Sequence, residues 1–154
     1  MRRAPADLSA ARSDLPGRPD RRRRGAATVE MAAIAPVLVA LVLGSIEFGR
    51  AMMVSNIMTT AAREGARVGA LPNKTNTDIT TVVNDRLDTS SISSAKATIK
   101  VYVNGVEKDA STAVSGDKVT VSVTVKFGDV SWLPAPWFIG KTTQMKGNAV
   151  MRRE

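Results

Sequence analysis

The first strong pattern in the chain is an apolar segment that fills most of residues 26–48, with Glu30 and Glu47 near its two ends as its only charges. A bilayer core is about 30 Å thick and a helix rises about 1.5 Å per residue, so a span needs roughly 20 apolar residues. Alanine, valine, leucine and isoleucine dominate this segment. The pattern predicts a transmembrane helix over residues 26–48, with a buried core helix as the alternative.

Beyond the apolar segment the pattern becomes periodic. No proline or turn residue intervenes before Leu71-Pro72-Asn73, which is expected to end the helix. Apolar and small residues recur at steps of three and four, the spacing of one helix face. These positions are Val54, Ile57, Met58, Ala61, Gly65 and Val68. The pattern predicts one long helix, embedded in the membrane at its start and amphipathic afterwards.

The rest of the chain predicts a short helix and then strands. A helix capped by Thr77 or Asp78 is expected to run through Leu87. Apolar residues then alternate with polar ones over residues 97–103, 119–127 and about 142–151, which is the period of half-buried strands. A long helix followed by a run of strands indicates an α+β, pilin-like fold, in which the amphipathic helix packs on a small antiparallel sheet. The strand order does not follow from these patterns.

The segment before the apolar run is basic and rich in proline. Residues 1–25 carry eight arginines against three aspartates and should form a disordered leader, because they cannot bury enough apolar surface to fold. Basic residues beside a first membrane segment stay in the cytoplasm. The run Arg21, Arg22, Arg23 and Arg24 therefore predicts a cytoplasmic N-terminus and an extracytoplasmic α+β domain at residues 49–154, in a single-pass protein of the inner membrane. A solvated tail, a nucleic-acid contact and a twin-arginine export signal are the less favoured alternatives.

Composition excludes several kinds of chemistry. The 154 residues carry a net charge of +8, of which +5 lies in residues 1–25, so the remainder is close to balanced and no nucleic-acid surface is indicated. Cysteine and histidine are absent. Their absence removes disulfides, the usual zinc sites and imidazole acid–base catalysis. The acidic residues are scattered singly, so we expect no catalytic residues, no metal, no cofactor and no small-molecule substrate. A membrane-anchored hydrolase that uses aspartate or serine is a remote alternative.

Glu30 needs a specific explanation, because a carboxylate below the lipid headgroups costs a few kcal/mol unless it is paired, protonated or reaches the surface. One interpretation places it in the first helical turn at the interface, where the helix dipole favours an anion. Alternatively, cleavage between Gly25 and Ala26 would expose the α-amine of Ala26, which could pair with Glu30 of a neighbouring subunit. Glu30 is therefore a candidate for subunit docking.

Two further groups of residues are candidate contact sites. Small residues spaced one turn apart let another backbone approach closely, and they occur at Ser45, Gly49, Ala61, Gly65 and Gly69. Packing against another helix is favoured for Ser45 and Gly49, whereas packing against the chain's own sheet is equally possible for Gly65.

Residues 132–138 form a proline-rich loop that contains Trp132, Trp137 and Phe138. This loop could close the end of the core, or it could form a partner surface or an interfacial anchor.

The segment from Gly25 to Glu30 resembles the processing site of type IV prepilins, in which a peptidase cuts after the glycine and a glutamate is the fifth mature residue. Together with Ala35-Pro36-Val37-Leu38, Gly44 to Arg50 and the run Ala61 to Arg67, it resembles the TadE-like family over residues 25–67. Met31 departs from the family, whose prepilins often carry an aromatic residue there. A secretory signal would instead be cut after its apolar run.

The resemblance implies a non-enzymatic minor pilin or pseudopilin of a tight-adherence (Tad, Flp-type) pilus or secretion filament. Its partners would be a prepilin peptidase, the inner membrane and other pilins or pseudopilins bound by helix–helix packing. The alternative is an unprocessed single-pass membrane protein whose outer domain binds an envelope partner.

Overall fold

The computed structural model describes residues 21–131 and 139–154, and describes side chains from Gly25 onward. The chain divides into two compact units, Met1–Ala40 and Leu41–Glu154. We call the second one the sheet unit. Helix α1 (Arg21–Gly69) contributes residues to both.

In the first unit the described residues are entirely helical. Helix α1 begins at Arg21, inside the segment that was expected to be a disordered leader over residues 1–25, so Arg21–Gly25 differ from that expectation. Arginine and alanine are good helix formers, and the last proline before the apolar run is Pro19, so nothing local stops the helix from starting there. Residues 1–20 lie outside the described residues. Pro36 lies within α1 without ending it.

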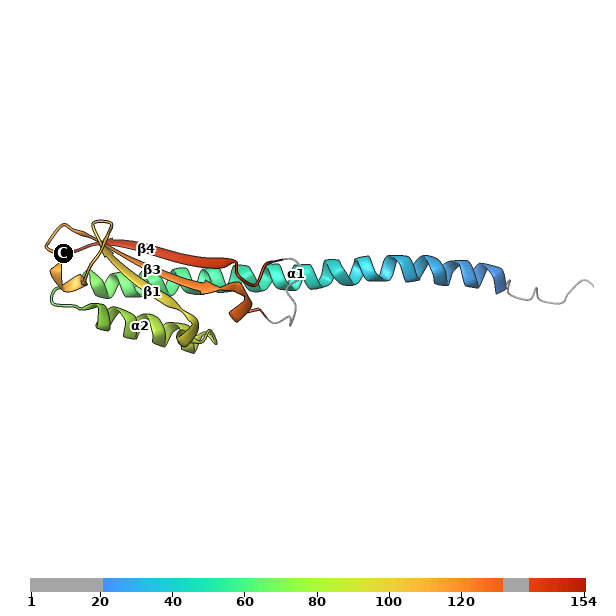
Figure 1. The fold of residues 1–154 in the computed structure, drawn as a ribbon, viewed down its shortest axis with the longest axis horizontal. Helices are drawn as coiled ribbons and strands as arrows, with labels where there is room; N and C mark the ends of the chain where they lie inside the picture. Colours follow the sequence, from blue (N-terminus) through green and yellow to red (C-terminus); the bar gives the residue numbers. More distant parts are fainter. Residues whose placement is uncertain (1–20, 132–138) are drawn as a thin grey trace, which may run out of the picture. The chain divides into compact units, whose positions relative to one another are not determined.

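The sheet unit has α+β architecture, and this confirms the predicted class (Figure 1). Its described strands are β1 (Thr98–Val103), β2 (Val106–Glu107), β3 (Lys118–Lys126) and β4 (Gln144–Arg152), which form an antiparallel sheet in the order β2-β1-β3-β4. The predicted strands are confirmed to within two residues at their ends.

Short connections join the strands. β1 and β2 form a hairpin through Asn104 (φ 51°) and Gly105 (φ 83°), the left-handed pair that a type I′ turn requires. Short 3-10 turns occur at Ser94–Lys96, Ala110–Thr112 and Phe127–Asp129.

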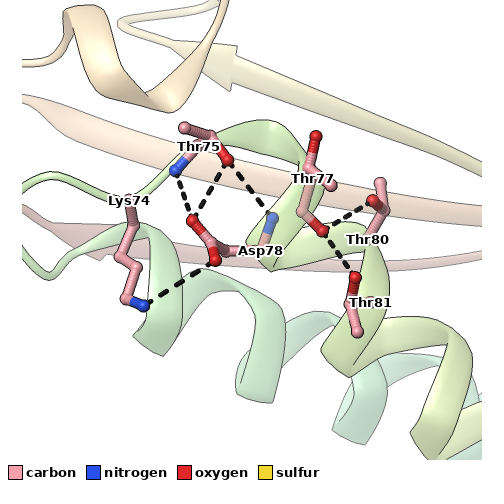
Figure 2. A network of polar contacts seen from close by, with 6 residues as sticks. All are labelled: Lys74, Thr75, Thr77, Asp78, Thr80 and Thr81. Atoms are coloured by element: carbon pink, nitrogen blue, oxygen red, sulfur yellow. Dashed lines mark hydrogen bonds and ion pairs between the residues drawn. The ribbon is translucent and has the colours of Figure 1, made fainter.

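Helix α2 (Asn76–Thr89) begins slightly before the predicted start, because Thr75 forms its cap. The Thr75 backbone N–H donates to Asp78 Oδ2 at 2.9 Å, while the Asp78 N–H donates to Thr75 Oγ1 at 3.4 Å, as Figure 2 shows. This reciprocal arrangement is a capping box. Lys74 Nζ lies 3.8 Å from Asp78 Oδ1 on the same network.

The core lies between the two helices and one face of the sheet. Val119, Val121, Val123 and Val125 of β3 are buried, and the sheet register places Val121 opposite Val101 of β1 and Ala149 of β4. Helix α2 adds Ile79, Val83 and Leu87, and α1 adds Val54, Met58, Ala61, Ala62 and Ala66. In Figure 1, α2 runs beside the later part of α1. The predicted packing of the amphipathic helix on the sheet is therefore confirmed.

Helix α1 lies very close to the sheet at Gly147 of β4. A Cβ atom there would lie 2.5 Å from the carbonyl carbon of Met58 and 2.6 Å from the Thr59 nitrogen. Both are backbone atoms of α1, which cannot move aside without shifting the helix. Only glycine allows β4 and α1 to pack at this distance.

We expect Gly147→Ala to lower the free energy of unfolding of the detergent-solubilised chain by about 3 kcal/mol, because overpacking against backbone forces the helix and sheet apart. Chemical denaturation measures this. Gly49→Ala is the matched control, since a Cβ at Gly49 would have no atom within 4 Å. The control should raise stability by up to about 1 kcal/mol through helix propensity. Equal effects of the two substitutions would contradict the packing described here.

We also expect the sheet unit to lose stability in acid. Hydrogen bonds from the Thr75 backbone N–H and hydroxyl hold the pKa of Asp78 below its ordinary value of 3.8. A depressed folded-state pKa gives stability that is present above the unfolded value and is lost as the pH falls through the folded value. Thermal unfolding midpoints measured from pH 7 down to about pH 2 should therefore drop below about pH 4, and Asp78→Asn should reduce that drop. The exposed Asp85, changed to Asn, is the control and should leave the drop unchanged.

Candidate membrane helix and subunit-docking residues

The first part of α1 exposes mostly large apolar side chains. In the first unit Val29, Met31, Ile34, Val37, Leu38 and Val39 are exposed, and in the sheet unit α1 exposes Leu41, Val42, Ile46, Phe48, Met52 and Met53. A helix this long and this apolar could cross a membrane, and it is the one candidate span among the described residues. An exposed apolar surface of this size is typical of a helix that contacts lipid or other apolar helices.

Glu30 lies on this helix with an exposed side chain. It is the only charged residue between Gly25 and Ile46. A Cβ added to Gly25 would meet no atom within 4 Å, and both Gly25 and Ala26 are exposed and helical. The candidate processing bond between them therefore lies inside a helix. For the arginine run, only the helical backbone of Arg21–Arg24 is described.

Glu47 and Arg50 form a buried polar site that the sequence analysis did not identify. Glu47 is 1% exposed and Arg50 is 8% exposed. Ser131 Oγ donates to Glu47 Oε1 at 3.3 Å, and Arg50 Nε donates to the Val130 carbonyl at 3.0 Å. Glu47 Oε2 has no hydrogen-bond partner among the described residues. The two residues are three apart on α1, so they share a helix face. This spacing is the only feature of the sequence that could have indicated a shared polar site.

Glu47 lies near the end of the segment that is predicted to be a membrane helix, residues 26–48. In the structure its side chain is buried and accepts a hydrogen bond from Ser131, which follows the Phe127–Asp129 turn. Phe48, its neighbour, is 64% exposed. At this point α1 therefore has one face that belongs to the core and one that is open, because successive helix positions point in different directions.

The small residues on α1 divide into two groups. A Cβ at Gly65 would lie 2.6 Å from Val83 Cγ2, and one at Gly69 would lie 2.8 Å from Ile79 Cδ1 and 2.9 Å from Val119 Cγ1. Ala61 is fully buried as well. Gly65 and Gly69 thus seat α1 against α2 and β3 of the same unit, which is one of the two alternatives for Gly65, and Ala61 lies in the core of that unit.

Ser45 and Gly49 behave differently. Ser45 is exposed, and its hydroxyl donates to the Leu41 carbonyl at 2.9 Å within α1. Gly49 is exposed and has open space where a Cβ would be. A helix-packing role for Ser45 and Gly49 stays a prediction, and these two positions are free to receive a neighbour.

The run from Ala61 to Arg67 has one buried face and one exposed face. Its small residues are buried, whereas Arg63 and Arg67 are exposed. Glu64 Oε1 lies 3.5 Å from Arg86 Nε of α2, so the run also links the two helices. Trp132, Trp137 and Phe138 lie outside the described residues, and the role of the aromatic loop stays a prediction.

Part of the chain matches a known protein family. Residues 25–67 match the model described as TadE-like protein, and this confirms the resemblance over that segment, which is less than a third of the chain. The matched residues include Glu30, Ser45, Gly49 and the buried site at Glu47 and Arg50. No curated protein and no solved structure matches the chain.

We expect Arg50→Met to lower the free energy of unfolding by about 1–3 kcal/mol, because the buried Val130 carbonyl loses its donor. Denaturant unfolding of the detergent-solubilised chain measures this. The control is Arg67→Met, which removes an exposed arginine from the same helix and should change stability by less than about 0.5 kcal/mol. If the two variants unfold at the same denaturant concentration, Arg50 does not hold this part of the fold.

Proposed function

We propose, from the match of residues 25–67 to the TadE-like model, that this chain is a non-enzymatic minor pilin or pseudopilin. It would take part in assembling a Tad- or Flp-type pilus or secretion filament in the cell envelope. The family match supports the coarser statement, a Tad pilus-associated protein. The finer role rests on the physical properties of α1.

The observation that carries the proposal is the uncovered apolar surface of α1 from Val29 to Met53. A helix with this surface is stable in lipid, and it is equally stable in a bundle of similar helices. Moving it from one to the other keeps apolar groups out of water throughout. The few polar groups on the helix therefore decide where it docks.

Glu30 is the polar group best placed to guide docking. Its side chain is exposed on a segment that is otherwise uncharged, so in lipid it needs a partner. A prepilin peptidase that cuts after Gly25 would give Ala26 a free α-amine, and Glu30 of one subunit would pair with Ala26 of the next. The basic residues Arg21–Arg24 would hold the leader on the cytoplasmic side of the inner membrane before cleavage. The sheet unit would then be extracytoplasmic.

Ser45 and Gly49 supply the second element of docking. Both are exposed on α1, and neither carries a side chain that would hold a neighbouring helix away. Residues of this size let two helix backbones approach closely. In the proposed filament they would receive the helix of an adjacent pilin.

One observation favours the alternative, an unprocessed single-pass membrane protein whose outer domain binds an envelope partner. The Gly25–Ala26 bond lies within α1, which begins four residues earlier at Arg21. A peptidase needs that turn to unwind before it can reach the bond. Glycine lowers the cost of unwinding, because it destabilises a helix by about 0.5–1 kcal/mol relative to alanine.

We expect the membrane-extracted protein to begin at Ala26 in cells that contain the peptidase and to keep its leader in cells that lack it. Intact-mass spectrometry of the purified chain measures this directly. Glu30→Gln should be processed normally but fail to enter filaments, because its side chain can no longer pair with an amine as an anion. Asp85→Asn, a charge removed from α2, is the control and should assemble normally. An intact leader in both strains would refute processing and favour the alternative.

A further inference from the structure

The sheet has one face that does not pack against the helices. Along β1, β3 and β4 the apolar and small residues that face the core alternate with residues that point the other way. The strand register places this second set together on one surface, which we call the open sheet face. It consists of Thr98, Lys100, Tyr102, Lys118, Thr120, Ser122, Thr124, Lys126, Gln144, Lys146, Asn148, Val150 and Arg152. Ser122 at its centre is buried, Tyr102, Thr120 and Thr124 are half-buried, and the others are exposed.

The open sheet face is strongly basic. Its five basic residues are exposed, and Glu107 of β2 is the acidic residue that the register adds to it, with Lys100 Nζ 2.8 Å from Glu107 Oε2. From residue 41 onward the chain carries fourteen basic and ten acidic side chains, a surplus of four positive charges. The open sheet face also carries a surplus of four. The rest of the sheet unit is therefore neutral, and its excess charge is concentrated on this one surface.

The positive charges are placed where they repel one another. Lys118 lies directly opposite Arg152 across the β3–β4 pair, and Lys126 is the diagonal neighbour of Lys146. Like charges directly opposite each other destabilise a sheet, and diagonal neighbours lie within reach of long side chains. Asp117 adjoins Lys118, but its carboxylate accepts hydrogen bonds from the Val114 N–H and the Asn104 amide. A bound anion would remove the repulsion.

The residues between the charges indicate what kind of anion fits. Threonine hydroxyls on β1 and β3 and the amides of Gln144 and Asn148 on β4 can both donate and accept hydrogen bonds, as a polymer of sugars requires. A protein partner would call for an apolar or aromatic centre, but the face offers only Tyr102 and Val150. One tyrosine is also too little to stack successive nucleic-acid bases. Lys118 and Lys126 are eight residues apart on β3, about 26 Å, so the ligand must be extended.

We propose that the open sheet face binds an extended anionic polysaccharide, with Lys118, Lys126, Lys146 and Arg152 contacting its carboxylate or phosphate groups. The strand hydroxyls and amides contact its sugar hydroxyls. This binding does not depend on filament assembly or on cleavage at Gly25. The sheet unit would bind this ligand in any envelope structure to which α1 anchors it.

The test uses the full chain in nonionic detergent, with fluorescent polygalacturonate as the anionic probe and uncharged dextran as its counterpart. We expect saturable binding of polygalacturonate that weakens as salt is raised, and none of dextran. The variant Lys118→Gln/Lys126→Gln/Lys146→Gln should bind about tenfold more weakly, the combined loss of three exposed charge contacts. Its thermal unfolding midpoint should be unchanged or higher, because the like-charge repulsion is relieved.

The matched control, Arg63→Gln/Arg67→Gln/Lys74→Gln, removes the same charge from α1 and the turn after it. It should keep wild-type affinity. If both variants lost affinity for polygalacturonate equally, the binding would depend on net charge alone, and the proposal would be overturned. The absence of polygalacturonate binding, or affinity for double-stranded DNA of matched charge that exceeds affinity for polygalacturonate, would also overturn it.

Discussion

The fold depends on how closely the second half of α1 can approach its own sheet and α2. Gly65, Gly69 and Gly147 lie where a Cβ atom would come within 2.9 Å of a neighbouring atom, and Ala61, Ala62 and Ala66 are buried beside them. Each small residue buries little apolar area by itself. The contact is stabilised because the backbones are closely packed and because valines of β3 and α2 pack against α1. Gly147 limits how closely α1 can approach the sheet, because the neighbours of Gly147 are backbone atoms of α1.

The same helix meets two different environments. Its earlier residues expose large apolar side chains, whereas the later ones alternate buried small residues with exposed Arg63 and Arg67. Between these parts, Glu47 and Arg50 are buried under Val130 and Ser131 while Phe48 remains open. A helix can do this because its side chains radiate in all directions, so one face can join a core while another stays available to lipid or to neighbouring helices. The proposed docking residues lie on the available part.

The sheet adds a separate property. A sheet whose inner face is apolar must place its polar residues outward, and in this chain those outward residues include five of the fourteen basic side chains after residue 40. The excess positive charge of the unit therefore lies on the outward face of the sheet. A charge count alone predicted a nearly balanced domain and no particular surface, because it contains no information about which strands are neighbours.

Local patterns in the sequence determined the elements themselves: the apolar run, the three- and four-residue period of α1, the alternation in the strands and the Asn104-Gly105 turn each depend on residues close together in the chain. The TadE-like resemblance also rested on such local motifs. The start of α2 was off by a few residues, because Thr75 and Asp78 cap it as a pair. The tertiary structure alone decided that Gly65 serves own-unit packing, that Glu47 is buried and that the lysines share one face. Each of these depends on contacts between residues far apart in sequence, such as Arg50 with Val130, and no local period encodes such contacts.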